Sequence, residues 1–196
     1  MSHLPDLRVY GYFLTCLRLF PIVENAVTNI KTLLDSLPPA LHSLQSGTQN
    51  TDHQPAYLAA MRHYIHISAR HKILVIHRAL LAHGGSSRER RKAHAACVEN
   101  AQFIIEEIEL GQMGGAGNMQ SFWTIPYHGL AAAVVLALDW ISIRRESGVQ
   151  AAVVDARRRE VQRARQTLEK LSPTSRIARR GLKVRTRNPL AISPHR

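Results

Sequence analysis

The stretch from Pro55 to Ala82 carries apolar residues three or four positions apart, and this spacing constrains the fold more than any other feature of the sequence. Apolar residues at such spacing lie on one side of an α-helix. Because the apolar stripe is wide, we expect it to face a core rather than a two-stranded coiled-coil seam. Gly84-Gly85 is expected to end the helix. The stripe comprises Leu58, Met61, Ile65, Ala69, Ile73, Ile76 and Leu80, broadened by Tyr57, Tyr64, Ile67, Leu74 and Leu81.

Helical spacing recurs along the chain, while strand signals are scarce. Pro21 is expected to separate a first helix from a second, and Pro38-Pro39 to end the second. Ser86 and Glu89 stand at the spacing of an N-terminal capping box. The sequence therefore predicts an all-α fold, a multi-helix orthogonal or bundle-like domain of about six or seven helices. The expected helices cover about residues 8–19, 22–37, 55–82, 86–110, 123–143 (or from 126) and 150–171, and a short one follows in "SRIARRGLKV".

The chain of 196 residues, of which 45% are hydrophobic and 20% charged, is long enough to bury the core of one domain. We expect that domain to cover residues 1–184. Residues 185–196 contain two prolines and little apolar content, so we expect them to be a basic, disordered tail. The two cysteines, Cys16 and Cys97, are too few for a disulfide framework or a four-ligand zinc site, and a reducing intracellular compartment is the simplest expectation.

The formal net charge of +12 is concentrated toward the C-terminus. Residues 144–196 hold 15 Lys and Arg against 4 Asp and Glu, so residues 1–143 are close to neutral. Such a basic segment binds nucleic acid or acidic surfaces in some proteins and is a solvated helix face in others. The clusters Arg144-Arg145 and Arg157-Arg158-Arg159 could serve nuclear import or an acidic partner.

No segment has the pattern of a signal peptide or a membrane span. The N-terminal stretch "VYGYFLTCLRLF" is short, is interrupted by Arg18 and lacks a small-residue cleavage site. In "GLAAAVVLALDWISI", nine apolar residues run from Leu130 to Leu138 before Asp139, whereas a span needs about 20. We expect no membrane partner. The helix that contains this stretch is apolar nearly all round, so we expect it to be central in the bundle.

Four histidines, His63, His66, His71 and His77, fall in the 55–82 helix. His63 and His66 lie one turn apart, but a zinc protease helix needs two histidines four residues apart and an adjacent glutamate. No carboxylate lies on this helix, so we predict no metal site. His77 and Arg78 stand toward its C-terminal end, where we expect them to interact as cations with the helix dipole and the exposed carbonyls.

The remaining motifs carry no recognisable chemistry. Glu106, Glu107 and Glu109 are the only clustered carboxylates, and we expect them to form a solvated helix face. "GQMGGAGNMQS" is rich in glycine but lacks the lysine and the preceding strand of a phosphate-binding loop. No nucleophile elbow or paired Glu-x-x-His motif occurs. We therefore assign no catalytic, cofactor-binding or metal-binding residue, and we predict that the chain is not an enzyme.

Five stretches in series resemble the regulatory domain of fungus-specific transcription factors, the middle homology region of zinc binuclear cluster (Zn2Cys6) regulators. The resemblance is to the C-terminal part of that domain and covers about residues 8–184. It implies a helical, non-catalytic domain that restrains or transmits activation. The stretches are "LLDSLPPAL", "YIHISARHKILVIHRALL", "SRERRKAHAACVENAQFII", "FWTIPYHGLAAAVVLALDW" and "VQRARQTLEKLSPTSRIARRGLKV".

The chain also departs from the family pattern. Ala79 stands where the family has a proline after His77-Arg78, so we expect a less kinked helix there. The six-cysteine cluster that holds zinc and binds DNA in the family is not in this sequence, and neither is the N-terminal half of the regulatory domain. We therefore expect a fragment or a truncated gene product.

The resemblance implies a nuclear location and regulation of transcription, with other transcription regulators or co-regulators as partners. It implies contact with DNA only through a domain outside this chain, zinc only in that domain, and no cofactor in this one. A small-molecule effector and a homodimer are further partners that the family suggests.

Two other functions remain open from the sequence. The first is a small helical enzyme or small-molecule-binding protein in which the Gly-rich residues 111–117 act as a lid over an apolar helix. The second is non-specific nucleic-acid binding through residues 144–196.

Overall fold

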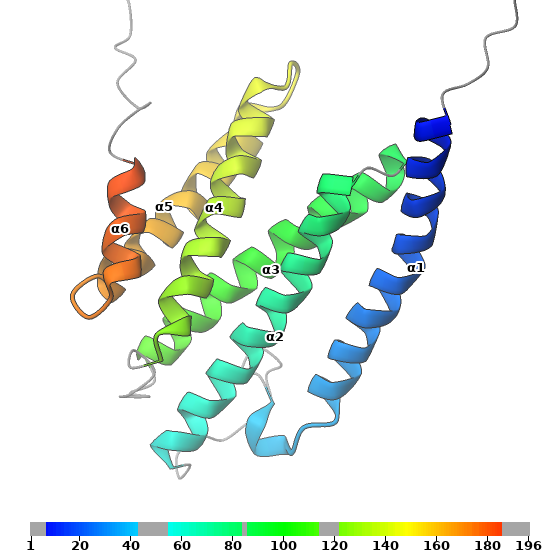
Figure 1. The fold of residues 1–196 in the computed structure, drawn as a ribbon. Coiled ribbons are helices and arrows are strands. Elements are labelled where there is room, and N and C mark those ends of the chain that lie inside the picture. Colours follow the sequence, from blue (N-terminus) through cyan, green and yellow to red (C-terminus); the bar gives the residue numbers. More distant parts are fainter. Residues whose placement is uncertain (1–6, 43–54, 84–85, 114–121, 186–196) are drawn as a thin grey trace, which may run out of the picture.

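The computed structural model describes residues 7–42, 55–83, 86–113 and 122–185, and within these ranges it contains α-helices and one short 3₁₀ helix but no strand (Figure 1). The predicted all-α fold class is thus confirmed. The elements are α1 (Leu7–Asp35), η1 (Pro39–Leu41), α2 (Ala56–His83), α3 (Ser87–Met113), α4 (Thr124–Arg145), α5 (Ala151–Leu171) and α6 (Arg176–Arg185).

The helices pack largely in the order in which they follow one another along the chain. Helix α1 packs against α2, α2 against α3, α3 against α4, and α4 against α5. Helix α6 lies against α4 and α5, on the side of the molecule opposite to α1 (Figure 1). Most contacts are therefore made between neighbours in sequence, as in helical bundles with short connections.

The main core lies among α2 to α6, and its residues stand at helical spacing. In α3 the buried residues Ala101, Ile104, Ile105 and Ile108 line one side of the helix. Burying an isoleucine side chain stabilises the fold by roughly 1.5–3 kcal/mol. A smaller cluster joins α1 to α2 and α3, and its buried members are Val23, Val27, Ile73, Leu80 and Ala93.

The predicted helix boundary at Pro21 is wrong, because α1 continues through Pro21 as one helix. Proline inside a helix removes one backbone hydrogen bond and crowds the preceding turn. Here the Pro21 side is exposed, while Val23 and Val27 on the same helix pack onto α2 and α3. Leu19 and Phe20, which precede Pro21, pack against the same cluster, so tertiary packing on both sides of Pro21 outweighs the local preference for a break. The predicted end before Pro38-Pro39 is confirmed, since α1 ends at Asp35.

The start of α3 has the capping geometry that its sequence predicts. The backbone N–H of Glu89 donates to Oγ of Ser86 at 3.2 Å, and the backbone N–H of Ser86 donates to Oε2 of Glu89 at 2.7 Å. Both hydrogen bonds satisfy N–H groups that a helix start leaves without partners. The helix then runs past Leu110 to Met113, three residues beyond the predicted end.

Helix α4 is central in its contacts, but it is not buried on every side. It contacts α2, α3, α5 and α6, and the residues that face these helices are buried. The opposite side is exposed although it is apolar, so the expectation of a helix buried all round is wrong.

Candidate interaction surface on α2 and α4

The exposed side of α4 carries a row of large apolar residues. Tyr127, Val134, Leu138 and Ile141 follow one another at intervals of seven, four and three residues, so they lie on one side of the helix. The residues that face the core, such as Ala132 and Leu136, lie on the opposite side. A row of this kind is not required to form the helix, because alanine or a polar residue would serve as well.

Helix α2 carries a matching row. Tyr57, Met61 and Val75 are exposed on the side that faces neither α1 nor α3. Lys72 lies in the same row, three residues before Val75. The buried residues Ile67 and Leu74 lie on another side of α2 and pack in the main core.

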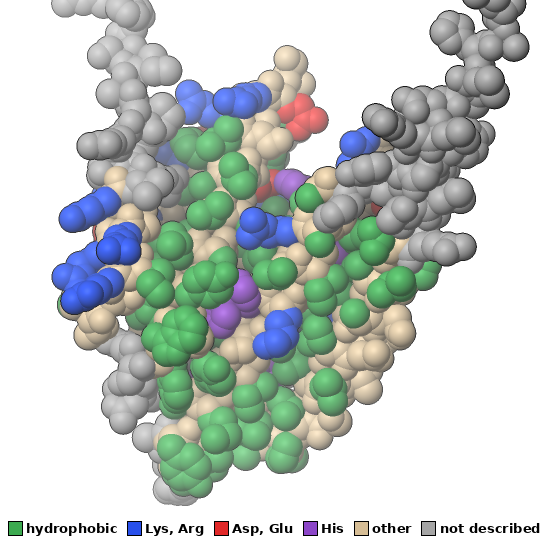
Figure 2. Space-filling view, viewed as in Figure 1, with side chains coloured by type: hydrophobic (Ala, Val, Ile, Leu, Met, Phe, Trp, Pro, Cys, Tyr) green, Lys and Arg blue, Asp and Glu red, His purple; other side chains and the backbone are tan. Residues whose placement is uncertain are grey.

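Ring contacts place the C-terminal end of the α2 row beside the N-terminal end of the α4 row. His71 of α2 lies with its ring centroid 4.2 Å from that of His128 and 5.3 Å from that of Tyr127, both in α4. Figure 2 shows apolar side chains over both helices, with histidine among them. We call this surface the α2/α4 face. Its residues are each between 37% and 72% exposed and comprise Tyr57, Met61, Val75, Trp123, Tyr127, Val134, Leu138 and Ile141.

The helices around this face are basic. Helices α2 and α6 contain no Asp or Glu, and the one acidic residue of α4, Asp139, is buried. Helix α6 lies close to α4, since a Cβ at Gly181 would stand only 2.5 Å from Cδ1 of Leu130. Figure 2 shows Lys and Arg along the α6 edge and at one end of the face. The exposed basic residues of the three helices include Lys72, Arg78, Arg144, Arg145, Arg179, Arg180 and Lys183.

The histidines beneath the face carry no charge at neutral pH. Burial, together with smaller contributions from the nearby His71 and Lys72, lowers the pKa of His128 to about 4. Burial also lowers the pKa of His71, with smaller contributions from Lys72 and Arg78. The positive charge of the face therefore comes from its lysines and arginines alone.

Three carboxylates of α3 and α4, those of Glu107, Glu109 and Asp139, are bound between helices. Nδ1 of His63 donates to Oε1 of Glu107 at 2.9 Å, and both side chains are buried between α2 and α3. The prediction that Glu107 belongs to a solvated face is wrong. Asp139, also buried, pairs with His94 of α3 at 3.3 Å and with Arg157 of α5 at 3.1 Å.

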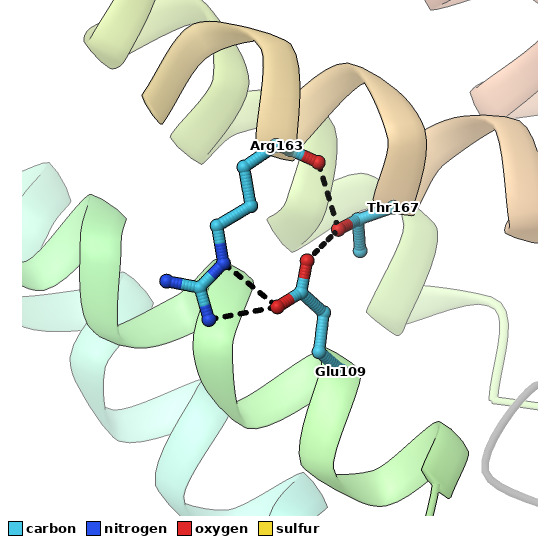
Figure 3. A network of polar contacts seen from close by, with 3 residues as sticks. All are labelled: Glu109, Arg163 and Thr167. Atoms are coloured by element: carbon cyan, nitrogen blue, oxygen red, sulfur yellow. Dashed lines mark hydrogen bonds and ion pairs between the residues drawn. The ribbon is translucent and has the colours of Figure 1, made fainter. Parts of the chain in front are cut away.

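Glu109 joins α3 to α5 (Figure 3). Its Oε2 accepts hydrogen bonds from Nε and Nη2 of Arg163, both at 2.7 Å, and its Oε1 accepts one from Oγ1 of Thr167 at 2.7 Å. These contacts raise the pKa of Arg163. Glu109 is thus also an interhelical partner rather than part of a solvated face.

The predicted histidines are spread over different contacts. Nε2 of His66 donates to the carbonyl oxygen of Leu41 at 2.9 Å, while His63 binds Glu107 and the ring of His71 packs against that of His128. Burial lowers the pKa of His77, so His77 is not the cation that we expected. Among the described residues, no three His, Cys, Asp or Glu side chains come together in a way that could hold a metal ion.

The remaining predictions concern the C-terminal half of α2, the Gly-rich lid and the C-terminal tail. Helix α2 continues to His83, so Arg78 lies more than a turn before the helix end, where the dipole acts only weakly. Helix α2 also runs through Ala79 without interruption, as the missing proline predicts. Of the proposed lid, residues 111–113 form the last turn of α3, and residues 114–117 lie outside the described residues, as do residues 186–196 of the predicted tail.

Helix α4 is also long and apolar enough to cross a membrane by length and composition, and half of its most apolar window is buried inside the fold. Its buried Asp139 and its contacts with four other helices are typical of a core helix in a folded domain. The sequence placed Tyr57 and Met61 in the core-facing stripe of the 55–82 helix, and this prediction is wrong for both residues because they are exposed. Periodicity predicted neither exposed row and did not reveal that the two rows meet at His71 and Tyr127.

No protein-family model matches the chain. Searches of curated proteins and of solved structures likewise returned no match. The resemblance to the fungal regulatory domain therefore stays a prediction.

Proposed function

We propose that this chain is a regulatory interaction domain of a Zn2Cys6-type transcription regulator, which acts in the nucleus by binding other proteins rather than by catalysis. The observation that carries the proposal is the α2/α4 face. It gathers eight large, exposed apolar residues on two adjacent helices. Monomeric proteins rarely expose contiguous apolar patches of more than a few hundred Å2 unless the patch binds something.

The composition of the face fits a protein partner. Aromatic residues and methionine are enriched in protein interfaces, and the face contains Trp123, Tyr57, Tyr127 and Met61. Two helices that present apolar side chains to solvent suit the docking of a further helix. The ordered resemblance of five segments to the regulatory domain supplies the biological setting: co-regulators as partners, and DNA contact and zinc in a separate domain.

Direct nucleic-acid binding by α5 receives less support. Arg157 pairs with Asp139, Arg163 with Glu109, and Arg165 with Glu169. These three arginines already have carboxylate partners, so part of the basic charge of residues 144–196 is compensated inside the domain. Phosphate binding would have to displace these carboxylates or rely on the remaining arginines.

A reporter assay tests the proposal. The chain would be fused to a DNA-binding domain of known specificity and a strong activation domain, and transcription from the matching promoter would be measured. We expect the chain to change reporter output, and Leu138→Asp to abolish that change. Leu33→Asp is the matched control, because Leu33 is exposed to a similar extent (67% against 61%) but lies on α1. Reporter output that is the same with and without the chain would contradict a regulatory role.

A further inference from the structure

We propose that the α2/α4 face binds an amphipathic α-helix whose apolar side is flanked by Asp and Glu. This inference rests on the proposed function and names the partner by its chemistry. Three observations carry it: the length of the two apolar rows, the charge of the helices around them, and the composition of the rest of the printed sequence.

Each row has the length of one bound helix. On α4 the row runs from Tyr127 to Ile141, which is about 21 Å at a rise of 1.5 Å per residue. On α2 the row runs from Tyr57 to Val75, or about 27 Å. His71, near the end of the α2 row, lies against Tyr127 at the start of the α4 row, so the two rows meet at these ends and are offset along the face. A helix of about 14–18 residues would therefore cover one row and reach the adjoining end of the other. Its apolar side chains at i, i+3, i+4 and i+7 would pack on the exposed apolar residues.

The charge around the rows determines the sign of the partner. Lys72 lies within the row of α2, and Arg145 extends the row of α4, four residues beyond Ile141. On the α6 edge, Arg179 and Lys183 are exposed on a helix without an acidic residue. Basic groups in these places would attract the acidic flanks of a bound helix and repel basic flanks. Such complementarity raises the association rate and the specificity of binding more than it raises the affinity.

The same charge argues against a second copy of this chain as the occupant. Two copies joined through this face would bring the basic groups of both copies into one interface, to which α2, α4 and α6 contribute no exposed carboxylate, and like charges at an interface are costly. The printed segments outside the described residues do not fit either. Residues 1–6 and 43–54 contain one acidic residue each, and residues 84–85, 114–121 and 186–196 contain none. We therefore look for the partner outside the printed sequence.

Fluorescence anisotropy with the full chain and labelled peptides tests this proposal. The probe is a peptide of about 16 residues with Leu and Phe at i, i+3, i+4 and i+7 and Glu at the flanking positions. A second peptide has the same composition with the apolar positions scrambled, and a third has Lys in place of every Glu. We expect the first peptide to bind at least about tenfold more tightly than either of the others.

Variants of the chain locate the binding. Leu138→Asp and the milder Leu138→Ser should each weaken binding of the first peptide by about tenfold or more, whereas Leu33→Asp should not. The double variant Lys72→Glu, Arg145→Glu should weaken the acidic peptide and strengthen the Lys peptide. Circular dichroism of each variant checks that the helices are intact; Leu138→Ser serves if Leu138→Asp does not fold.

Several results would overturn the proposal. These are equal binding of the scrambled peptide, no binding of the first peptide, or full binding by both Leu138 variants. Binding of duplex DNA or of anionic phospholipid vesicles that is lost in Leu138→Ser would assign the face to another class of partner. Loss of the reporter effect in Leu138→Asp without any peptide binding would reject the acidic helix but keep the regulatory role. Peptide binding without a reporter effect would reject the regulatory role alone.

Discussion

Nδ1 of His63 donates to Oε1 of Glu107 across the interface of α2 and α3, at 2.9 Å and with both side chains almost fully buried. Arg62, the neighbour of His63 in α2, is buried as well. Burial lowers the pKa of Arg62, and the negative charge of Glu107 partly offsets this effect. The carboxylate of Glu107 thus supports buried basic groups on α2.

Glu107→Gln removes this negative charge with little change in size. We expect it to lower the free energy of unfolding by about 3 kcal/mol, because the buried basic groups lose their counter-charge. Urea unfolding followed by circular dichroism measures the change. Glu99→Gln on the exposed side of α3 is the control and should have an effect within about 0.5 kcal/mol. Equal effects of the two substitutions would show that the buried carboxylate has no special role.

Thr167→Val replaces a buried hydroxyl with a methyl group of similar size. The hydroxyl donates to Glu109 of α3 and lies 3.0 Å from the carbonyl oxygen of Arg163 (Figure 3). We expect a loss of about 1–2 kcal/mol of unfolding free energy, because Glu109 loses a hydrogen bond. Thr28→Val is the control, since the exposed Thr28 bonds only to a carbonyl of its own helix. Thermal unfolding of both variants measures the two losses of stability. Equal losses would contradict a stabilising role for the hydrogen bond from Thr167 to Glu109.

Stability should fall between pH 7 and about pH 4, in part because of His128. Its pKa is lowered to about 4 in the folded chain, so the unfolded chain binds more protons in this range. The contribution of His128 to the free energy of unfolding is fully present above its unfolded pKa of about 6.5. As the pH falls from there to 4, this contribution decreases by about 3 kcal/mol. We expect His128→Phe to flatten the dependence of unfolding free energy on pH. A slope equal to that of the unmodified chain would contradict the prediction.

Cys97 should be unreactive in the folded chain. It is buried in α3, and burial raises its pKa to about 11, so little thiolate forms at pH 8. In a Cys16→Ser variant, which leaves Cys97 as the one thiol, we expect labelling by a thiol reagent to be slow and to accelerate in urea. Rapid labelling without denaturant would show that this part of the core opens readily.

Pro21→Ala tests whether α1 is one helix. Alanine would restore a backbone hydrogen bond inside α1, so we expect the unfolding free energy to rise by about 2–3 kcal/mol. Pro39→Ala is the control, because a proline at the first position of a helix costs no hydrogen bond. If α1 were two helices that meet at Pro21, the substitution would bring no gain.

Local patterns in the sequence were sufficient to predict most of the helices. The stripe from Leu58 to Leu80 and the Ser86–Glu89 capping box depend on residues within one or two turns of each other, so neighbours along the chain contain the information. The continuity of α1 through Pro21 does not depend on neighbours alone. It requires the packing of Val23 and Val27 on other helices, which no local pattern records.

The α2/α4 face could be predicted from the sequence to a smaller degree than the helices. The sequence by itself determined that α2 and α4 are helices and that α2 carries no acidic residue. It placed Glu107 in an apparently solvated group and α4 in the centre, because a pattern shows which residues share a side but not what covers that side. The packing of α3 against both helices buries Glu107 and leaves the rows that contain Met61 and Leu138 exposed, and these rows meet where His71 lies against Tyr127. Burial is a property of the assembled helices, so only the tertiary structure decided which apolar residues form the core and which remain for a partner.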